Sequence, residues 1–289
     1  GEIILPAPSW VSYQPQALVG KNKVHWIQTS SSTNWFPTAE QIENKIKNIE
    51  NKNLLLFLNS PNNPSGTVCN NFEEIAEVAR KYKLTILSDE IYSNLTFNNK
   101  YKSISSFYPQ GTIVSTGLSK WCGAGGWRLG FFAIPNQLKE LKHSLKVLCS
   151  ESFTSVSAPI QYAAVEAYSG DYSNYLEIVK KILFATGMHV YENLKSNGIN
   201  VLKPEGGFYL FPEFLNAKFS SSSKMCKDIL DKTGVALLPG SDFGINDTKM
   251  IARLSYTDFD GSNFLKKTLG SKNLDKVDLE KYAPNIVEG

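Results

Sequence analysis

Cysteine and histidine are scarce in this chain of 289 residues, which limits the kinds of site it can build. They are found at Cys69, Cys122, Cys149, Cys226, His25, His143 and His189. The cysteines have no Cys-x-x-Cys spacing and the histidines stand apart from them, so neither a zinc site nor a disulfide framework is expected. We therefore expect no metal and a reducing compartment, the cytoplasm.

Long apolar runs and blocks of one charge are also absent. No run is long enough to cross a membrane, and the first residues, GEIILPAPSW, lack the charged start and apolar core of a signal peptide. The net charge is only +3 and the basic residues are scattered, so the basic patch of a nucleic-acid binder is missing. We expect small-molecule partners, with no nucleic acid and no membrane.

Arginine is the third scarce residue. Of the 30 Lys+Arg residues only Arg80, Arg128 and Arg253 are arginine, so lysine is used wherever a generic positive charge suffices. A planar guanidinium can form bidentate hydrogen bonds to a carboxylate or phosphate, which an ammonium cannot do. Arg80 lies in the amphipathic stretch EEIAEVARKYK, which predicts a solvated helix position. Arg128 and Arg253 are the candidates for binding anions.

Short apolar runs bounded by turn residues recur in the first half of the chain. They cover residues 54–58, 84–87, 112–116 and 131–134, and helical patterns cover 38–48 and 72–83. Buried strands that alternate with helices are typical of a mainly parallel sheet in an α/β protein, with right-handed βαβ units.

The second half is more helical. Helical patterns run through LKELKHSLKVL, APIQYAAVEAY and residues 173–196, and the stretch GINVLKPEGGFYLFPEF that follows indicates strands of a smaller unit. We therefore predict a large domain over 1–180 and a small C-terminal α/β domain over 181–289, with the boundary near residue 180.

Two polar motifs follow predicted strands directly. NSPNNPSG, residues 59–66, follows the run at 54–58, and SDEIY, residues 88–92, ends the run at 84–87. The first has the composition of a turn, and Asp89 could simply cap a helix. In open parallel sheets, however, ligands bind beyond the carboxyl ends of the strands, which is where Asp89 and Tyr92 are expected.

A third motif is more specific. Lys120 lies between the run at 112–116 and a glycine-rich loop over 123–130 that contains Arg128. A lysine amine can condense with an aldehyde, and glycines let the backbone approach an anionic ligand. Lys120 could instead clamp a phosphate, but the spacing of a P-loop, GxxxxGK[ST], is not met.

In combination these motifs carry a family resemblance. NSPNNPSG, SDEIY, PEGGFYLFP and ARLSY occur in this order, and 117–130 fits a lysine-site pattern closed by Arg-apolar-Gly. The chain resembles the class I/II, fold-type I pyridoxal-phosphate aminotransferases, such as the aspartate, aromatic and alanine enzymes. The resemblance implies a three-layer α/β/α large domain, pyridoxal 5'-phosphate as cofactor and a homodimer. It also implies ping-pong transfer of an amino group between an L-amino acid and a 2-oxo acid.

The resemblance also implies roles for individual residues at the cofactor ring. Lys120 would form the Schiff base and move a proton during catalysis, and Asp89 would pair with the protonated ring nitrogen. Tyr92 and Asn63 would bind the 3'-oxygen of the ring, and Trp10 in PSWVSY would stack on it.

Two groups of anion ligands are implied in the same way. Arg128 and Ser119 would hold the cofactor phosphate, and Arg253, together with Asn63, would bind the substrate α-carboxylate.

The chain departs from the family pattern in two respects. It begins where family members have already completed an N-terminal portion, so we expect that portion to be missing. Dicarboxylate specialists in one branch use a further arginine for the distal carboxylate, yet none occurs between Arg128 and Arg253. Two alternatives stay open: a carbon-sulfur β-lyase of the same fold and a non-catalytic, aminotransferase-like ligand-sensing domain.

Overall fold

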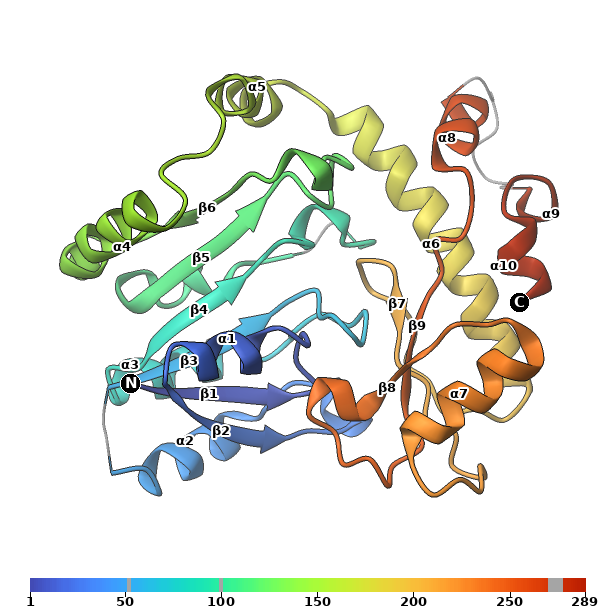
Figure 1. The fold of residues 1–289 in the computed structure, drawn as a ribbon, viewed down its shortest axis with the longest axis horizontal. Helices are drawn as coiled ribbons and strands as arrows, with labels where there is room; N and C mark the ends of the chain where they lie inside the picture. The colour runs from blue at the N-terminus through green and yellow to red at the C-terminus, as the bar shows by residue number, and fades with distance from the viewer. Residues whose placement is uncertain (51–52, 99–100, 270–277) are drawn as a thin grey trace.

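The computed structural model describes residues 1–50, 53–98, 101–269 and 278–289. Two sheets organise this part of the chain, a six-stranded one in the first half and a three-stranded one in the second. Figure 1 shows the long helix α6 (Ser173–Ser196) running along the side of the molecule that carries the small sheet. None of the helices in the described ranges combines the length and apolarity that a membrane crossing requires.

The large sheet has the strand order β2-β1-β3-β4-β5-β6. Its strands are β1 (Glu2–Ala7), β2 (Lys23–Gln28), β3 (Leu54–Asn59), β4 (Thr85–Asp89), β5 (Thr112–Gly117) and β6 (Gly130–Ala133). The first five are parallel, and β6 pairs antiparallel with β5. The four strands expected from the sequence are therefore present, in a mainly parallel sheet. β1 and β2 extend it on one side.

Helices cover both faces of this sheet. The early helices are α1 (Tyr13–Val19), α2 (Ala39–Lys47) and α3 (Phe72–Lys81). Neighbouring strand residues point to opposite faces, so Ile3 packs with α1 while Ile4 packs with α2 and α3. The result is the expected three-layer α/β/α arrangement.

The amphipathic patterns explain why α2 and α3 form where they do. Thr38 caps α2 by accepting from the backbone N–H of Gln41, whose side chain accepts from the N–H of Thr38 in return. In α2, Ile42 and Ile46 are buried, and in α3 the residues Phe72, Ile75, Ala76 and Ala79 are buried. Arg80 is exposed on α3, as its place in the helical pattern predicts.

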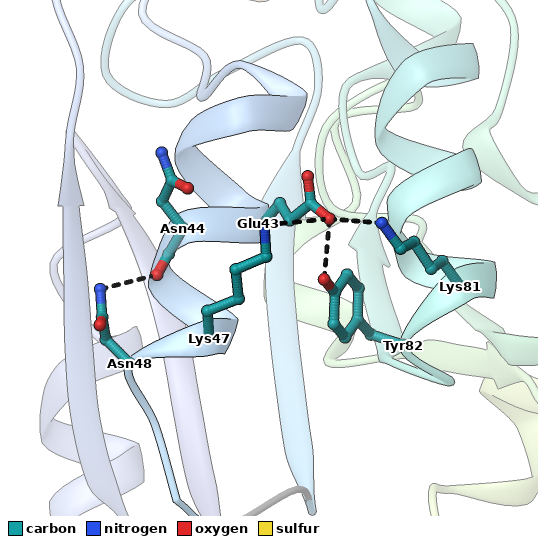
Figure 2. A network of polar contacts seen from close by, with 6 residues as sticks. All are labelled: Glu43, Asn44, Lys47, Asn48, Lys81 and Tyr82. Atoms are coloured by element: carbon teal, nitrogen blue, oxygen red, sulfur yellow. Dashed lines mark hydrogen bonds and ion pairs between the residues drawn. The ribbon is translucent and has the colours of Figure 1, made fainter.

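An ionic contact joins the outer sides of these two helices. Figure 2 shows that Glu43 of α2 accepts from the Lys81 ammonium and the Tyr82 hydroxyl, both at 2.7 Å. Lys47, one turn further along α2, lies 3.5 Å from the same oxygen. The hydrogen bonds from Lys81 and Tyr82 lower the pKa of Glu43 to about 2.

The second half holds the remaining elements. The helices are α4 (Lys139–Ser152), α5 (Ala158–Ser169), α6, α7 (Ser222–Thr233), α8 (Gly261–Leu269), α9 (Leu279–Tyr282) and α10 (Pro284–Glu288). The small antiparallel sheet has the order β7-β9-β8, formed by β7 (Tyr209–Leu210), β9 (Ala252–Ser255) and β8 (Leu238–Pro239). The predicted long helix over 173–196 is confirmed, and the predicted boundary near residue 180 falls inside it.

Apolar side chains are exposed along one margin of the large sheet. All four residues of β6 are exposed, and α4 buries none of its residues. Figure 1 shows α4 and α5 on the β6 side of the sheet. Seven of the exposed apolar residues there define what we call the α4–α5 surface: Phe132, Leu141, Val147, Leu148, Phe153, Tyr162 and Val165. Exposed apolar groups on this scale mark contact surfaces more often than free ones.

Candidate active site

The ends of three neighbouring parallel strands carry the predicted site residues to one edge of the large sheet. Asn59 at the end of β3 is paired with Asp89 at the end of β4, which is paired with Ser115 of β5. The loops that follow these strands contain Asn63, Tyr92 and Lys120. This is the carboxyl edge, where ligands bind in open α/β sheets.

The amine of Lys120 lies near the aromatic rings of Tyr92 and Phe208. In the described ranges no hydrogen bond or ion pair holds its Nζ atom, which lies 5.8 Å from the ring centre of Tyr92 and 5.7 Å from that of Phe208. Burial lowers its pKa, as do the positive charges of Arg253 and Arg128, while Asp89 acts in the opposite direction. The amine is therefore neutral, and able to act as a nucleophile, at a lower pH than an ordinary lysine.

Asp89 is anchored by two neutral donors. Tyr13 donates from its hydroxyl to Oδ2 at 2.6 Å, and the backbone N–H of Ile91 donates to Oδ1 at 3.2 Å. Burial raises the pKa of Asp89, while these two hydrogen bonds and the charge of Lys120 work against the rise. Across the described residues this carboxylate forms no ion pair, so it can still receive a cationic partner.

Arg253 connects the small sheet to the loop after β3. Its Nη1 atom donates to Asn63 Oδ1 at 3.0 Å, and its guanidinium carbon lies 4.5 Å from the ring centre of Tyr209 and 5.2 Å from that of Phe243. The rings and the amide fix the plane of the guanidinium. Since a guanidinium has five N–H donors and Asn63 takes one, donors are left for a carboxylate ligand.

Tyr92 is a buried residue whose ring lies near the Lys120 amine. It is 3% exposed, packs edge-on against Phe208, and its oxygen lies 3.5 Å from that of Tyr209. Burial raises the pKa of Tyr92 well above its usual value. The group therefore stays protonated and acts as a hydrogen-bond donor at neutral pH.

The remaining predicted residues surround this centre less closely. Arg128 is exposed, has a left-handed backbone with φ of 54°, and donates from Nη1 to the carbonyl of Gly125 at 2.6 Å. Its charge still lowers the pKa of Lys120, which places it within electrostatic range of the amine. Ser119 precedes the lysine directly and is partly buried. Trp10 is 37% exposed and contacts Tyr13 edge-on at 5.3 Å.

The structure adds three residues to the predicted set, namely Tyr13, Phe208 and Tyr209. Tyr13 stands three positions after Trp10 in PSWVSY, but nothing in the sequence pairs it with Asp89, 76 residues away. Phe208 and Tyr209 belong to PEGGFYLFP, which predicted strands rather than site residues. A glycine fixes their place: Gly66 has φ of +70°, and a Cβ there would lie 2.1 Å from the carbonyl oxygen of Tyr209.

A family comparison decides the relationship of the chain to known proteins. The model of the family "Aminotransferase class I and II" matches residues 1–263. The chain belongs to the class I and II aminotransferases. This confirms the family resemblance carried by the motifs and, with the sheet and its helical layers, the α/β fold of fold type I.

Individual class I and II aminotransferases are similar to this chain at moderate identity. The aspartate aminotransferase of Bacillus sp. (strain YM-2) is 34% identical over 266 residues, and the asparagine–oxo-acid transaminase of Streptococcus mutans is 33% identical over 266. Both alignments cover 88% of this chain and 65% of the relative, so the chain spans just under two thirds of these relatives' length.

A solved aminotransferase also matches the fold. The structure of the aspartate aminotransferase from Thermus thermophilus with maleate superposes with a TM-score of 0.81 and 27% identity. The superposition covers 93% of this chain and 68% of that chain.

Proposed function

We propose that this protein is a pyridoxal-phosphate-dependent aminotransferase that moves an amino group between an L-amino acid and a 2-oxo acid by a ping-pong route. The observation that carries the proposal is the Lys120 amine near the anchored acid Asp89: the pKa of the amine is lowered, and no other described residue holds it by a hydrogen bond or ion pair. A lysine on the surface would not have its pKa lowered by burial. Membership of the class I and II aminotransferases supports the same assignment.

The residues at the strand ends fit pyridoxal phosphate. Its aldehyde needs a free amine, which Lys120 offers, and its ring nitrogen needs an acid, which Asp89 offers with no competing ion pair from the described residues. Arg128 and Ser119 stand in the glycine-rich loop as ligands for its phosphate. When bound, pyridoxal phosphate supplies an electron sink that stabilises negative charge at the substrate α-carbon.

The chain's own groups then have separate tasks. Lys120, whose amine is neutral at a lower pH than usual, would hold the cofactor and afterwards act as the base that moves the proton from the α-carbon. Asp89 would keep a negative charge beside the ring nitrogen. Tyr92, which stays protonated, would donate with Asn63 to the 3'-oxygen, and Trp10 would cover the ring.

Arg253 would bind the substrate α-carboxylate. Its guanidinium is held by Asn63, Tyr209 and Phe243, so little conformational freedom is lost when a carboxylate binds. The names of the relatives make aspartate and asparagine the first amino acids to test. Since no arginine occurs between Arg128 and Arg253, a distal carboxylate would need another ligand.

We also propose a homodimer in the cytoplasm. The α4–α5 surface supports the homodimer, because exposed apolar side chains of this number are costly in water and a second copy would cover them. The compartment is supported by the cysteines, since all four are free thiols.

The test is an amino-transfer assay on the purified protein with pyridoxal phosphate. With aspartate or asparagine and 2-oxoglutarate as the acceptor, we expect glutamate to form, and Lys120→Ala to abolish its formation. Lys224→Ala, which removes an exposed lysine on α7, is the matched control and should leave the rate unchanged. Release of pyruvate and ammonia from cysteine or cystathionine without transfer would instead identify a β-lyase.

A further inference from the structure

A hydrogen bond from a residue with no predicted role holds the acid of the candidate site. We propose that Tyr13 is a positioning residue for Asp89, whose hydroxyl fixes the orientation of the carboxylate and keeps it ionised at the place where a cationic ring nitrogen would bind. The catalytic consequence rests on the proposed function. The contact itself, Tyr13 Oη to Asp89 Oδ2 at 2.6 Å, concerns only residues of this chain.

The fold brings these two side chains to the same face of the large sheet. Ile86 of β4 packs in the cluster that contains α2 and α3, so Asp89, three residues later, points to the opposite face. That opposite face is covered by α1, which begins at Tyr13. The pairing therefore follows from strand periodicity and from the position of α1.

The ring of Tyr13 is held firmly, so its hydroxyl has a defined position. Tyr13 is 5% exposed and contacts Trp10 edge-on at 5.3 Å. Phe57 of β3 packs against it at 5.0 Å with the planes tilted by 51°. With two aromatic rings packed against it, the Tyr13 ring brings its hydroxyl to Asp89 without ordering a mobile group, and this favours the hydrogen bond.

The Tyr13 hydroxyl is a neutral donor, and its hydrogen bond stabilises the ionised form of Asp89. Burial and the nearby charge of Asp89 raise the pKa of Tyr13 well above its usual value, so its hydroxyl stays protonated. Burial raises the pKa of Asp89, and the hydrogen bond from Tyr13 is the largest effect that opposes this rise. Removal of the hydroxyl should therefore raise the pKa of Asp89 further, and the carboxylate would ionise only at higher pH.

Other titratable groups near Asp89 act on its charge more weakly or in the opposite sense. Lys120 favours the ionised acid when its amine is protonated. Glu90, whose pKa burial raises, is repelled by Asp89 when both are ionised. Tyr92 and Tyr101 have raised pKa values and stay neutral. The Tyr13 hydroxyl is thus a neutral donor that acts on Asp89 over the whole range of physiological pH.

The first experiment needs no cofactor. The carboxylic-acid C=O band of Asp89, identified by its absence from Asp89→Asn, is followed by infrared difference spectroscopy as the pH changes. In Tyr13→Phe we expect the protonation midpoint to rise by about 1 to 2 pH units, the shift that the loss of a hydrogen bond to a charged group produces. An unchanged midpoint would mean that Tyr13 only fills space, and would overturn the proposal.

A matched control and a melting curve complete this experiment. Tyr82→Phe also deletes a hydroxyl that donates to a carboxylate, Glu43 at 2.7 Å, but on the outer side of α3, and it should leave the Asp89 midpoint where it is. Phenylalanine keeps the ring that packs against Trp10 and Phe57, so Tyr13→Phe should melt close to wild type. Failure of this variant to fold would make the hydroxyl a folding determinant, and would also contradict the proposal.

The second experiment adds pyridoxal phosphate. We expect Tyr13→Phe to weaken its binding about tenfold, in proportion to a pKa shift of about one unit, while the amino-acid KM changes less. An unchanged cofactor affinity would contradict the positioning role. If wild type also fails to bind pyridoxal phosphate, the proposed function is wrong, whereas the infrared result on Tyr13 and Asp89 stands by itself.

Discussion

Asp89 and Lys120 have opposite charges, and each modifies the ionisation of the other. Burial shifts both groups toward their neutral forms, and their mutual attraction acts against that shift. Arg253 adds a positive charge that lowers the pKa of Lys120 further. A lysine in these surroundings becomes neutral at a lower pH than a lysine on the surface does.

Arg253 allows a prediction at the residue scale. Arg253→Lys keeps the charge but loses the planar, two-pronged contact, so the KM for every amino-acid substrate should rise by about 10- to 100-fold, with a smaller change in kcat. Steady-state kinetics with several amino acids measures this. Arg80→Lys on α3 is the control, since Arg80 donates to the backbone carbonyl of Phe107 outside the site. A rise confined to one amino acid would contradict an α-carboxylate contact.

At the scale of elements, the loop after β3 is shaped by its contact with the small sheet. Gly66 accepts from the backbone N–H groups of Glu205 and Gly206 at 2.9 and 3.1 Å, and the carbonyl oxygen of Tyr209 leaves no room for a side chain there. Asn63 lies in the same loop and binds Arg253 of β9. The loop therefore sets the relative position of two site residues from distant parts of the sequence.

The steric role of Gly66 can be tested by comparison with Gly198, a glycine that also has a positive φ but open space around its Cβ position. Gly66→Ala and Gly198→Ala both force alanine into a positive φ, +70° and +76°, but only at Gly66 would the new Cβ collide with a backbone oxygen. Strain alone costs about 1 kcal/mol, so Gly198→Ala should show roughly that loss in the free energy of unfolding. Gly66→Ala should lose clearly more in denaturant unfolding. Equal losses in the free energy of unfolding would mean that the loop moves to relieve the clash without further destabilisation.

The contact between α2 and α3 gives a prediction that depends on pH. The pKa of Glu43 falls to about 2 from its usual 4.5, so its contribution to stability is present above pH 4.5 and is lost as the pH falls toward 2. Glu43→Gln should lower the melting temperature slightly at neutral pH, because the contact is exposed and screened by salt. The difference from wild type should vanish at low pH in thermal melts.

The control for this pair is Glu192→Gln on α6, an exposed carboxylate that forms no ion pair in the described ranges. Its melting temperature should follow that of wild type at each pH. A Glu43→Gln difference that persists unchanged at pH 2 would show that the effect comes from something other than the ionised carboxylate.

Periodicity predicted most of these elements, but not all. The strands at β3 to β6 and the helices α2, α3 and α6 have clear apolar patterns, and these were expected close to their observed bounds. The strand β1 was not, since EIILPA contains a proline, a residue that is unfavourable in a central strand. The strands of the small sheet were expected only in outline, because two-residue strands such as β7 are defined by their partners and not by a local pattern.

The candidate site was predictable only where a motif marks it. Lys120, Asp89, Tyr92, Asn63 and Arg253 stand in short motifs of recognisable order. The fold places the first four at one edge of the large sheet, where Asn63 accepts from Arg253 of β9. Tyr13 has no local signal, since its contact with Asp89 depends on how α1 packs on the sheet. Tyr209 also has no local signal, because its contact with Arg253 depends on the pairing of β7 with β9.

At the scale of the whole molecule, the α4–α5 surface is the feature that the described chain leaves uncovered. Seven apolar residues are exposed there, beside the edge strand β6. Their burial against a second copy would be favourable by about 25 cal/mol for each Å² removed from water, before the costs of association. A symmetric contact would bury the same residues from both copies.

The dimer can be tested by placing charge on this surface. Leu148→Lys together with Val165→Lys should shift the protein toward monomer in analytical ultracentrifugation, because two buried ammonium groups per copy would be strongly unfavourable. Leu215→Lys is the control, since Leu215 is 75% exposed on the loop before α7, away from this surface. A dimer that survives the double substitution would place the interface elsewhere.

One measurement tests the central claim most directly: the chemical identity of the residue that carries pyridoxal phosphate. The protein is incubated with the cofactor, treated with borohydride to make any lysine bond permanent, digested, and analysed by mass spectrometry. The account predicts one modified peptide, labelled at Lys120, and no such label in Lys120→Ala. A label on another lysine, or none on wild type under conditions where a known aminotransferase is labelled, would contradict it.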